Sequence, residues 1–127
     1  MATIELTTEN LDASIENNDI LIIDFWAEWC GPCKMFGPVF EKASEQYPDI
    51  VFAKCNTELQ QQVAGSFGIS SIPTMAVFRE KILIYMQPGA LPEQGLKEII
   101  EKGKALDMDQ VRKDITEQEK KNNQDLQ

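Results

Sequence analysis

The sequence predicts an α/β fold, in which a mixed β-sheet carries helices on both faces. The 127 residues, 43% of them apolar, fit one ordinary domain with a substantial core. Two short apolar runs, at 19–27 and 50–56, are typical of strands buried on both faces. Helical patterns alternate with these strands, which indicates parallel pairing, and two later strands in close succession predict an antiparallel hairpin.

The N-terminal half is expected to contain three strands and two helices. Thr7 or Thr8 can cap the first helix, because a side-chain oxygen there can accept a bond from a free backbone N–H. Pro32 suits the first turn of the second helix, where its missing N–H is not needed. The predicted elements are, in order, a strand at 3–6, a helix at 7–17, a strand at 19–27, a helix at 32–47 and a strand at 50–56.

The C-terminal half adds a helix, a hairpin and a further helix. Thr57 and Gln60 have the spacing of a capping box, and Gly68 can end the helix that they would open. The last helix would present Leu96, Ile99 and Ile100 on one face. The predicted elements are a helix at 57–67, strands at 74–78 and 82–86 joined by a turn at 79–81, and a helix from 92. The whole chain thus supplies five strands and four helices before its last segment.

The last segment differs in character, so we divide the chain into a domain at 1–104 and an extension at 105–127. Met108, Val111 and Ile115 fall at helical spacing after a capping candidate at Asp107, and the chain is polar beyond this stretch. We expect a short amphipathic helix with a frayed end. This helix either docks on its own domain or binds a partner.

Charge and hydropathy exclude several classes of function. The net charge of −9 makes nucleic acid and anionic membrane surfaces poor partners, because both require a basic face. No window approaches the ~18 apolar residues of a membrane span. The first residues lack the positive and apolar regions of a signal peptide. We therefore expect a cytoplasmic monomer whose cysteines are normally reduced.

The three cysteines narrow the chemistry further. The absence of histidine excludes Ser-His-Asp and Cys-His nucleophiles, and one CxxC plus a remote cysteine cannot form a Cys₄ zinc site, so we expect no metal. For Cys30 and Cys33 the remaining chemistry is thiol–disulfide exchange. Cys30 should be the exposed and more acidic thiol, because free N–H groups and the helix dipole at a helix N-terminus favour a thiolate. An inert, structural CxxC is the alternative.

These motifs together resemble the thioredoxin family over about residues 2–104. A CxxC alone is weak, but WCGPC after a buried strand, followed by Ile-Pro-Thr at 72–74, is specific. The matching segments are Asp24–Lys34, Lys54, Ser71–Thr74 and Gly89–Leu91. The resemblance implies the thioredoxin fold, a central five-stranded mixed sheet flanked by four helices. It also implies a redox-active disulfide that serves electron transport and cell redox homeostasis, without a bound cofactor.

The resemblance implies an oxidoreductase that reduces protein disulfides. The Cys30 thiolate would attack a disulfide of a protein substrate, and Cys33 would resolve the mixed disulfide. Electrons would come from thioredoxin reductase using NADPH. Gly31 and Pro32 supply no histidine to stabilise the thiolate, which favours a reductant over an oxidase or isomerase. The rival from another class is a redox-gated binding module or holdase of the same fold.

Asp24 and Lys54 are charged residues in strands that should be buried. Burial should raise the pKa of Asp24 and let it exchange protons near neutral pH. In the family, the matching aspartate assists deprotonation of the buried thiol, here Cys33, and the matching lysine pairs loosely with it. A structural carboxylate and an ordinary strand-end lysine are the alternatives.

The loop at 72–73 resembles the family's cis-proline loop, which faces the cysteines. A cis bond before Pro73 would leave the Ile72 backbone free to pair with an extended substrate strand. Trp29, Ile72, Pro73, Pro88 and Gly89 would then form a flat apolar substrate-binding patch around Cys30. Core packing is the alternative for Trp29 and Ile72, and Pro88 stands where relatives more often have a β-branched residue.

Cys55 directly follows Lys54, so its side chain should point to the opposite side of the same strand. A buried free cysteine commonly acts as a small hydrophobic residue. A regulatory thiol is the alternative.

Overall fold

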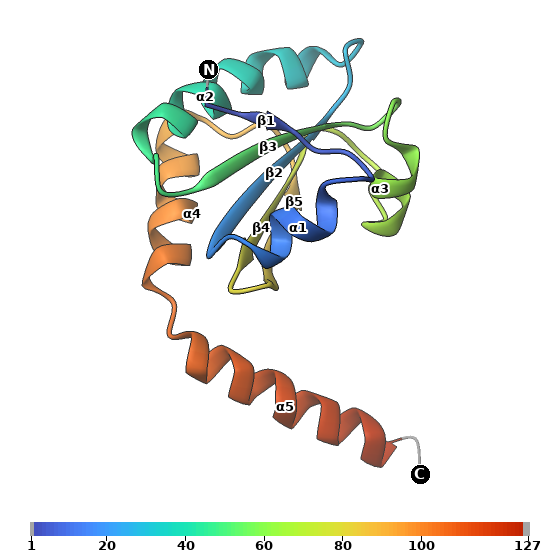
Figure 1. The fold of residues 1–127 in the computed structure, drawn as a ribbon, viewed down its shortest axis with the longest axis vertical. Coiled ribbons are helices and arrows are strands. Elements are labelled where there is room, and N and C mark those ends of the chain that lie inside the picture. The colour runs from blue at the N-terminus through green and yellow to red at the C-terminus, as the bar shows by residue number, and fades with distance from the viewer. Residues whose placement is uncertain (1, 126–127) are drawn as a thin grey trace.

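The computed structural model of the chain describes residues 2–125 (Figure 1). Five strands form one sheet in the order β1-β3-β2-β4-β5. β1 and β2 each run parallel to β3, while β4 runs antiparallel to both β2 and β5, so the predicted mixed sheet is confirmed. The strands are β1 Ile4–Glu5, β2 Ile20–Trp26, β3 Val51–Asn56, β4 Thr74–Arg79 and β5 Ile82–Pro88.

Helices cover both faces of this sheet, as predicted. Along β2, Ile20 and Ile22 pack in a core cluster with side chains of α2 and α4, whereas Leu21, Ile23 and Phe25 pack on the side of α1 and α3. This division follows from the alternation of side chains along a strand. The helices are α1 Leu11–Glu16, α2 Gly31–Gln46, α3 Gln61–Ser66, α4 Glu93–Ala105 and α5 Met108–Asp125.

The start of α1 differs from the prediction. The helix begins at Leu11, after a turn in which Thr7 and Asn10 bond reciprocally. The Asn10 N–H donates to the Thr7 hydroxyl (3.3 Å), and the Thr7 N–H donates to the Asn10 side-chain oxygen (2.8 Å). Thr7 therefore closes the turn that precedes the regular helix.

The capping box at Thr57 and Gln60 is wrong. The Thr57 hydroxyl donates to the Trp26 carbonyl oxygen (3.2 Å), and the Gln60 side chain accepts a bond from the Thr8 backbone N–H (3.1 Å). Both side chains form hydrogen bonds with residues outside this segment and do not cap a helix here. α3 starts only at Gln61. Gly68 follows the helix with φ +64°, a conformation that glycine adopts readily, and ends it as predicted.

The predicted hairpin of β4 and β5 is confirmed. Its turn places Glu80 and Lys81 at φ +49° and +70°. Just before the turn, the Arg79 guanidinium donates to the carbonyl oxygens of Gly103 (2.7 Å) and Lys104 (3.0 Å). These carbonyl groups belong to the last turn of α4, where no helical N–H is available to them. The hydrogen bonds from Arg79 therefore connect the C-terminus of α4 to the sheet.

α5 is longer than the short helix expected, and Figure 1 shows it projecting away from the sheet. The Gln110 N–H donates to the Asp107 carboxylate (3.1 Å), which confirms the predicted cap. Met108 is buried and Arg112 pairs with Glu80 (2.7 Å), whereas Ile115 is exposed. The helix is therefore docked only through its first turns. The polar stretch beyond Glu117, which was expected to fray, continues as helix to Asp125, and residues 126–127 lie outside the described residues.

Among residues 2–125, no helix has the length and the apolar character needed to cross a membrane.

Candidate functional site

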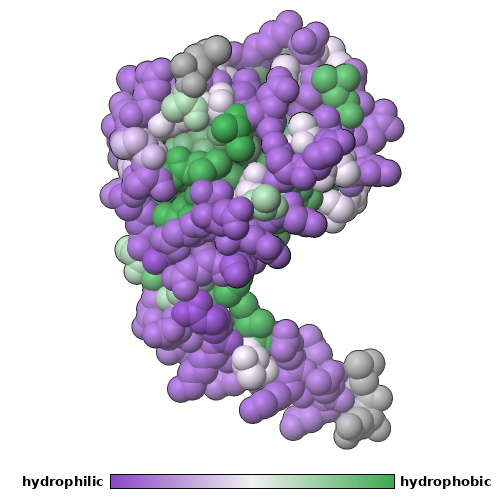
Figure 2. Space-filling view, viewed as in Figure 1, coloured by the Kyte–Doolittle hydropathy of each residue, from purple (hydrophilic) through white to green (hydrophobic). Residues whose placement is uncertain are grey.

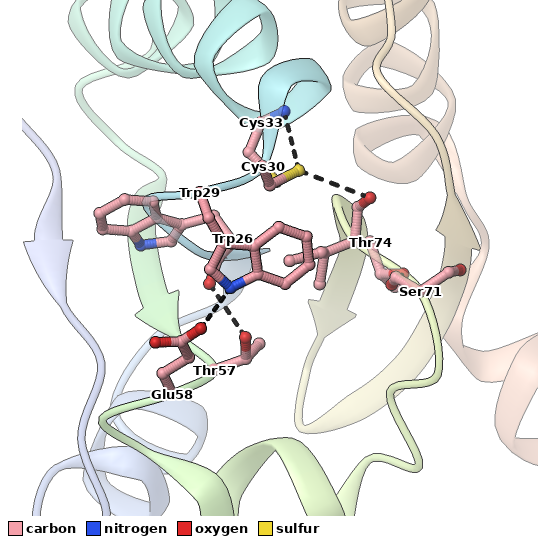
Figure 3. Close-up of a disulfide and its surroundings, with 9 residues drawn as sticks. Trp26, Trp29, Cys30, Cys33, Thr57, Glu58, Ser71 and Thr74 are labelled. Carbon is pink, nitrogen blue, oxygen red and sulfur yellow. Dashed lines mark hydrogen bonds between the residues drawn. A yellow bond between two sulfur atoms is a disulfide. The ribbon is translucent and has the colours of Figure 1, made fainter.

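Cys30 and Cys33 lie at the N-terminus of α2, where β2 gives way to the helix. Cys30 is the N-cap residue, and its Sγ accepts a hydrogen bond from the Cys33 N–H (3.2 Å, Figure 3). The two residues form a disulfide, and their Cα atoms are 5.2 Å apart. The helix thus supplies the N–H donor and dipole that would stabilise a Cys30 thiolate once the disulfide is reduced.

The prediction that Cys30 is exposed is wrong for this disulfide form. Only 3% of its surface is exposed, the same fraction as for Cys33. The reason is the approach of the loop before β4, whose Ile72 carbonyl oxygen lies 3.7 Å from the Cys30 Sγ. Cys30 nevertheless lines a surface pocket of about 390 Å³, so a molecule bound there would contact it. The pocket is lined by Trp29, Cys30, Gly31, Pro32, Thr57, Ile69, Ser70, Ser71 and Ile72.

Trp29 forms one side of this pocket with a largely free ring. Its surface is 68% exposed, which excludes core packing as the reason for a tryptophan here. The ring N–H donates to the Glu58 carboxylate, so the side chain is held although it is exposed (Figure 3). Ile72, on another side of the pocket, is half-buried.

The structure also brings together the two proline loops predicted for the site. The Ile72–Pro73 bond is cis, as expected. The Gly89 N–H donates to the Pro73 carbonyl oxygen (2.8 Å), and Pro88 is paired with Thr74 across β4 and β5. Pro88 and Gly89 are exposed, whereas Pro73, expected in the same apolar patch, is buried, and none of the three lines the pocket that contains Cys30.

Asp24 is fully buried in the middle of β2, on the face covered by α2. Neither carboxylate oxygen has a hydrogen-bond partner among the described residues. Burial raises the pKa of Asp24 from 3.8 to about 7, and the charge of Lys54 partly opposes this rise. The raised pKa expected from the sequence is therefore confirmed.

Lys54 lies opposite Asp24 in the register of β2 and β3. Its ammonium group stands 4.7 Å from the centre of the Trp26 ring, and no ion pair joins it to Asp24 within residues 2–125. A cation over an aromatic ring is stabilised without a carboxylate partner. Lys54 thus acts on Asp24 only through its longer-range charge.

Cys55 is a free thiol with no exposed surface, in the core cluster on the opposite side of the sheet. Burial, reinforced by the charge of Asp24, raises its pKa to about 11. This thiol is therefore inert near neutral pH.

Several residues of the pocket beside Cys30 were not predicted from the sequence. Ile69, Ser70 and Ser71 directly precede the Ile-Pro-Thr motif, so the motif itself pointed to them. Thr57 and Glu58 follow β3, whose parallel pairing with β2 brings the carboxyl ends of both strands to one edge of the sheet. That topology was predicted, and it would have placed both residues beside Trp29.

Comparison with known proteins identifies the family. The family model described as Thioredoxin matches residues 2–102. The chain belongs to the thioredoxin family. A thioredoxin-named protein of Streptomyces coelicolor is 55% identical over 118 residues, covering 93% of this chain and 88% of the relative.

Solved thioredoxin structures agree with this assignment. A thioredoxin of Plasmodium falciparum has a TM-score of 0.73 at 35% identity, covering 79% of this chain and 98% of that one. A mutant thioredoxin of Halobacterium salinarum has a TM-score of 0.76 at 32% identity, covering 82% and 92%. This thioredoxin is accordingly a dithiol–disulfide oxidoreductase, and Cys30 and Cys33 are its redox-active pair. Within residues 2–125, no group of three or more histidine, cysteine or acidic side chains could hold a metal ion.

Proposed function

We propose that this thioredoxin reduces protein disulfides, with Cys30 as the attacking nucleophile. The observation that carries the proposal is the hydrogen bond from the Cys33 N–H to the Cys30 Sγ at the N-terminus of α2. A bond of this kind stabilises the thiolate, which is the reactive form. Cys33 has no such position, because it lies within the first turn of α2 and not at its N-cap.

The reaction takes two exchanges of sulfur partners. The Cys30 thiolate attacks one sulfur of the substrate disulfide, forms a mixed disulfide and releases the other sulfur as a thiolate. The Cys33 thiolate then attacks the Cys30 Sγ, which forms the Cys30–Cys33 disulfide and releases the second substrate thiol. The substrate gains two electrons, and the thioredoxin loses them.

Asp24 serves the second exchange as a proton acceptor for Cys33. Its pKa of about 7 and its burial on the side of the sheet covered by α2 support this role. Lys54, opposite Asp24 in the sheet, lowers the cost of the Asp24 charge before the proton arrives.

The substrate chain lies across the pocket beside Cys30 and along the loop at Ile72 and Pro73. Gly31, Pro32 and Trp29 line this pocket and would contact the substrate chain. Pro88 and Gly89, tied to Pro73 through a backbone hydrogen bond, extend the surface on the other side. The exposure of Trp29, Pro88 and Gly89 supports this arrangement.

The oxidised protein is returned to the dithiol by a thioredoxin reductase that uses NADPH, and the family relationship supports this electron donor. The protein works as a monomer in the cytoplasm. We also retain the division into a redox domain at 1–104 and an extension at 105–127. The family match ending at 102 and the projection of α5 support that division.

Turnover of insulin with NADPH and a bacterial thioredoxin reductase tests the proposal. We expect NADPH oxidation that depends on the thioredoxin, and a loss of at least a thousandfold in Cys30→Ser, because no other accessible thiolate remains. Cys33→Ser should instead accumulate a mixed disulfide, visible by mass spectrometry. Insulin binding that survives loss of both cysteines, with no turnover by the wild type, would favour the binding module or holdase.

A further inference from the structure

A second exposed surface adjoins the redox site on the side of Trp29. Leu59, in the loop between β3 and α3, is 77% exposed, the highest fraction among the large hydrophobic residues described. Figure 2 shows an isolated hydrophobic patch over this loop, surrounded by hydrophilic residues. The adjacent Glu58 accepts a hydrogen bond from the Trp29 ring, so the loop that carries Leu59 is joined to the Trp29 side of the redox site. We call the loop 56–60, with the hollows on either side of it, the Leu59 surface.

The loop that carries Leu59 is fixed from several directions. The Asn56 side-chain oxygen accepts the backbone N–H groups of Glu58 (3.0 Å) and Leu59 (3.2 Å). The Gln60 N–H donates to the Asn56 carbonyl oxygen (2.8 Å), and the Thr57 N–H donates to Trp26 (2.9 Å). Because the loop is held in this way, Leu59 is presented to solvent by a rigid support. Because the loop backbone is already ordered, a partner that covers Leu59 does not have to order it.

The Leu59 surface is acidic. No lysine or arginine occurs in residues 55–78. The two hollows that Leu59 lines, of about 640 and 400 Å³, contain five glutamates and a single lysine, which is the Lys54 held over Trp26. The glutamates are Glu5, Glu9, Glu28, Glu41 and Glu58. A partner that covers Leu59 therefore gains from positive charge beside its own apolar side chain.

We propose that the Leu59 surface is a second docking point for protein substrates, and that it selects segments carrying an apolar side chain flanked by lysine or arginine. The proposal rests on the proposed function, since the segment belongs to the protein whose disulfide Cys30 attacks. The continuity from the Cys30 pocket through Trp29 and Glu58 places the docking point beside the reacting disulfide. Small disulfides do not reach this surface, so it affects only extended substrates.

The test uses two synthetic peptides, each with one cysteine joined to thionitrobenzoate by a disulfide. One peptide carries a leucine between two lysines a few residues from the cysteine, and the other carries glutamates in their place. The reduced protein supplies two electrons to each peptide disulfide and releases thionitrobenzoate, whose absorbance is followed while NADPH and a thioredoxin reductase return the protein to the dithiol. We expect the lysine peptide to react about tenfold faster in kcat/KM than the glutamate peptide.

Variants separate docking from chemistry. Leu59→Ser should lower kcat/KM for the lysine peptide about five- to tenfold, mainly through KM, and Glu9→Lys should reduce the preference between the peptides. Both variants should reduce dithiobis(nitrobenzoate), a small disulfide, at the wild-type rate. The matched controls are Leu83→Ser, an exposed leucine on β5, and Glu117→Lys on α5, which should change neither measurement.

Two results would overturn the docking proposal: equal use of both peptides by the wild type, or an unchanged kcat/KM in Leu59→Ser. Failure to reduce dithiobis(nitrobenzoate) would instead contradict the proposed function. In that case, binding of a cysteine-free lysine peptide to the oxidised protein, followed by NMR at the backbone amides of residues 58–61, which are present in both proteins, still decides the question. Shifts that are lost in Leu59→Ser support docking, and the absence of shifts in the wild type excludes it.

Discussion

Cys30 and Cys55 are both buried cysteines, yet their surroundings give them opposite chemistry. Cys30 has 3% of its surface exposed and Cys55 has none. The Cys30 Sγ accepts an N–H at the start of a helix and borders a surface pocket. Cys55 lies among apolar side chains, and the buried carboxyl of Asp24 adds negative charge to its environment.

The comparison shows that the exposed fraction of a cysteine does not decide its reactivity. What differs is the polar environment of the sulfur and its access to a pocket. A few backbone N–H donors at a helix N-terminus favour the thiolate form of a buried cysteine. Burial without such donors favours the neutral thiol. The reactive thiol at the N-terminus of α2 and the inert thiol on β3 can therefore occur in one small domain.

The largest expected effect is a difference in alkylation rate. In the reduced protein at pH 8, iodoacetamide should modify Cys30 at least a hundredfold faster than Cys55. A pKa of about 11 leaves Cys55 only about one part in a thousand as thiolate, and its burial blocks access as well. Mass spectrometry of proteolytic fragments over time measures both rates, and unfolding in urea should remove the difference. Labelling of Cys55 in the folded protein at a comparable rate would revive the regulatory-thiol alternative.

The next effect concerns Asp24, whose charge contributes to the raised pKa of Cys55. Its pKa is about 7 in the folded protein, against 3.8 for an ordinary aspartate, so between these values the folded state binds more protons than the unfolded state. Stability should therefore fall as pH rises from 4 to 7 and level off above, with a contribution of about 4 kcal/mol from this group.

Asp24→Asn should remove this dependence and stabilise the oxidised protein at pH 8 by about 2–4 kcal/mol, with little gain near pH 4. Urea unfolding at several pH values measures it. The same variant should slow resolution of the mixed disulfide. A variant less stable than the wild type at pH 8 would show that the carboxylate has a structural role.

The smallest effect is expected at Cys55 itself. Cys55→Ala should cost about 1 kcal/mol of stability, since it removes one buried sulfur from a packed cluster. Insulin reduction should stay within the error of the wild-type rate. A clear loss of activity at unchanged stability would mean that the thiol takes part in the redox cycle.

Much of the fold could be predicted because the signals were local. The apolar strands, the proline at the start of α2 and the glycine after α3 each fix nearby backbone, and all are in place. The capping box failed because Thr57 and Gln60 bond to Trp26 and Thr8, residues remote in sequence. Partners of this kind depend on how the chain returns to itself, which spacing alone does not reveal.

The chain by itself determined the redox pair, the helix that holds it and the buried position of Asp24, because these depend on short-range pattern and hydropathy. Only the tertiary structure decided that Cys30 is covered by the Ile72 loop, that Lys54 stands over Trp26 and that α5 leaves the domain. Each of these outcomes is a contact, or the lack of one, between segments far apart in the sequence. The competition among partners for a polar or apolar group is settled only when all of them are folded together.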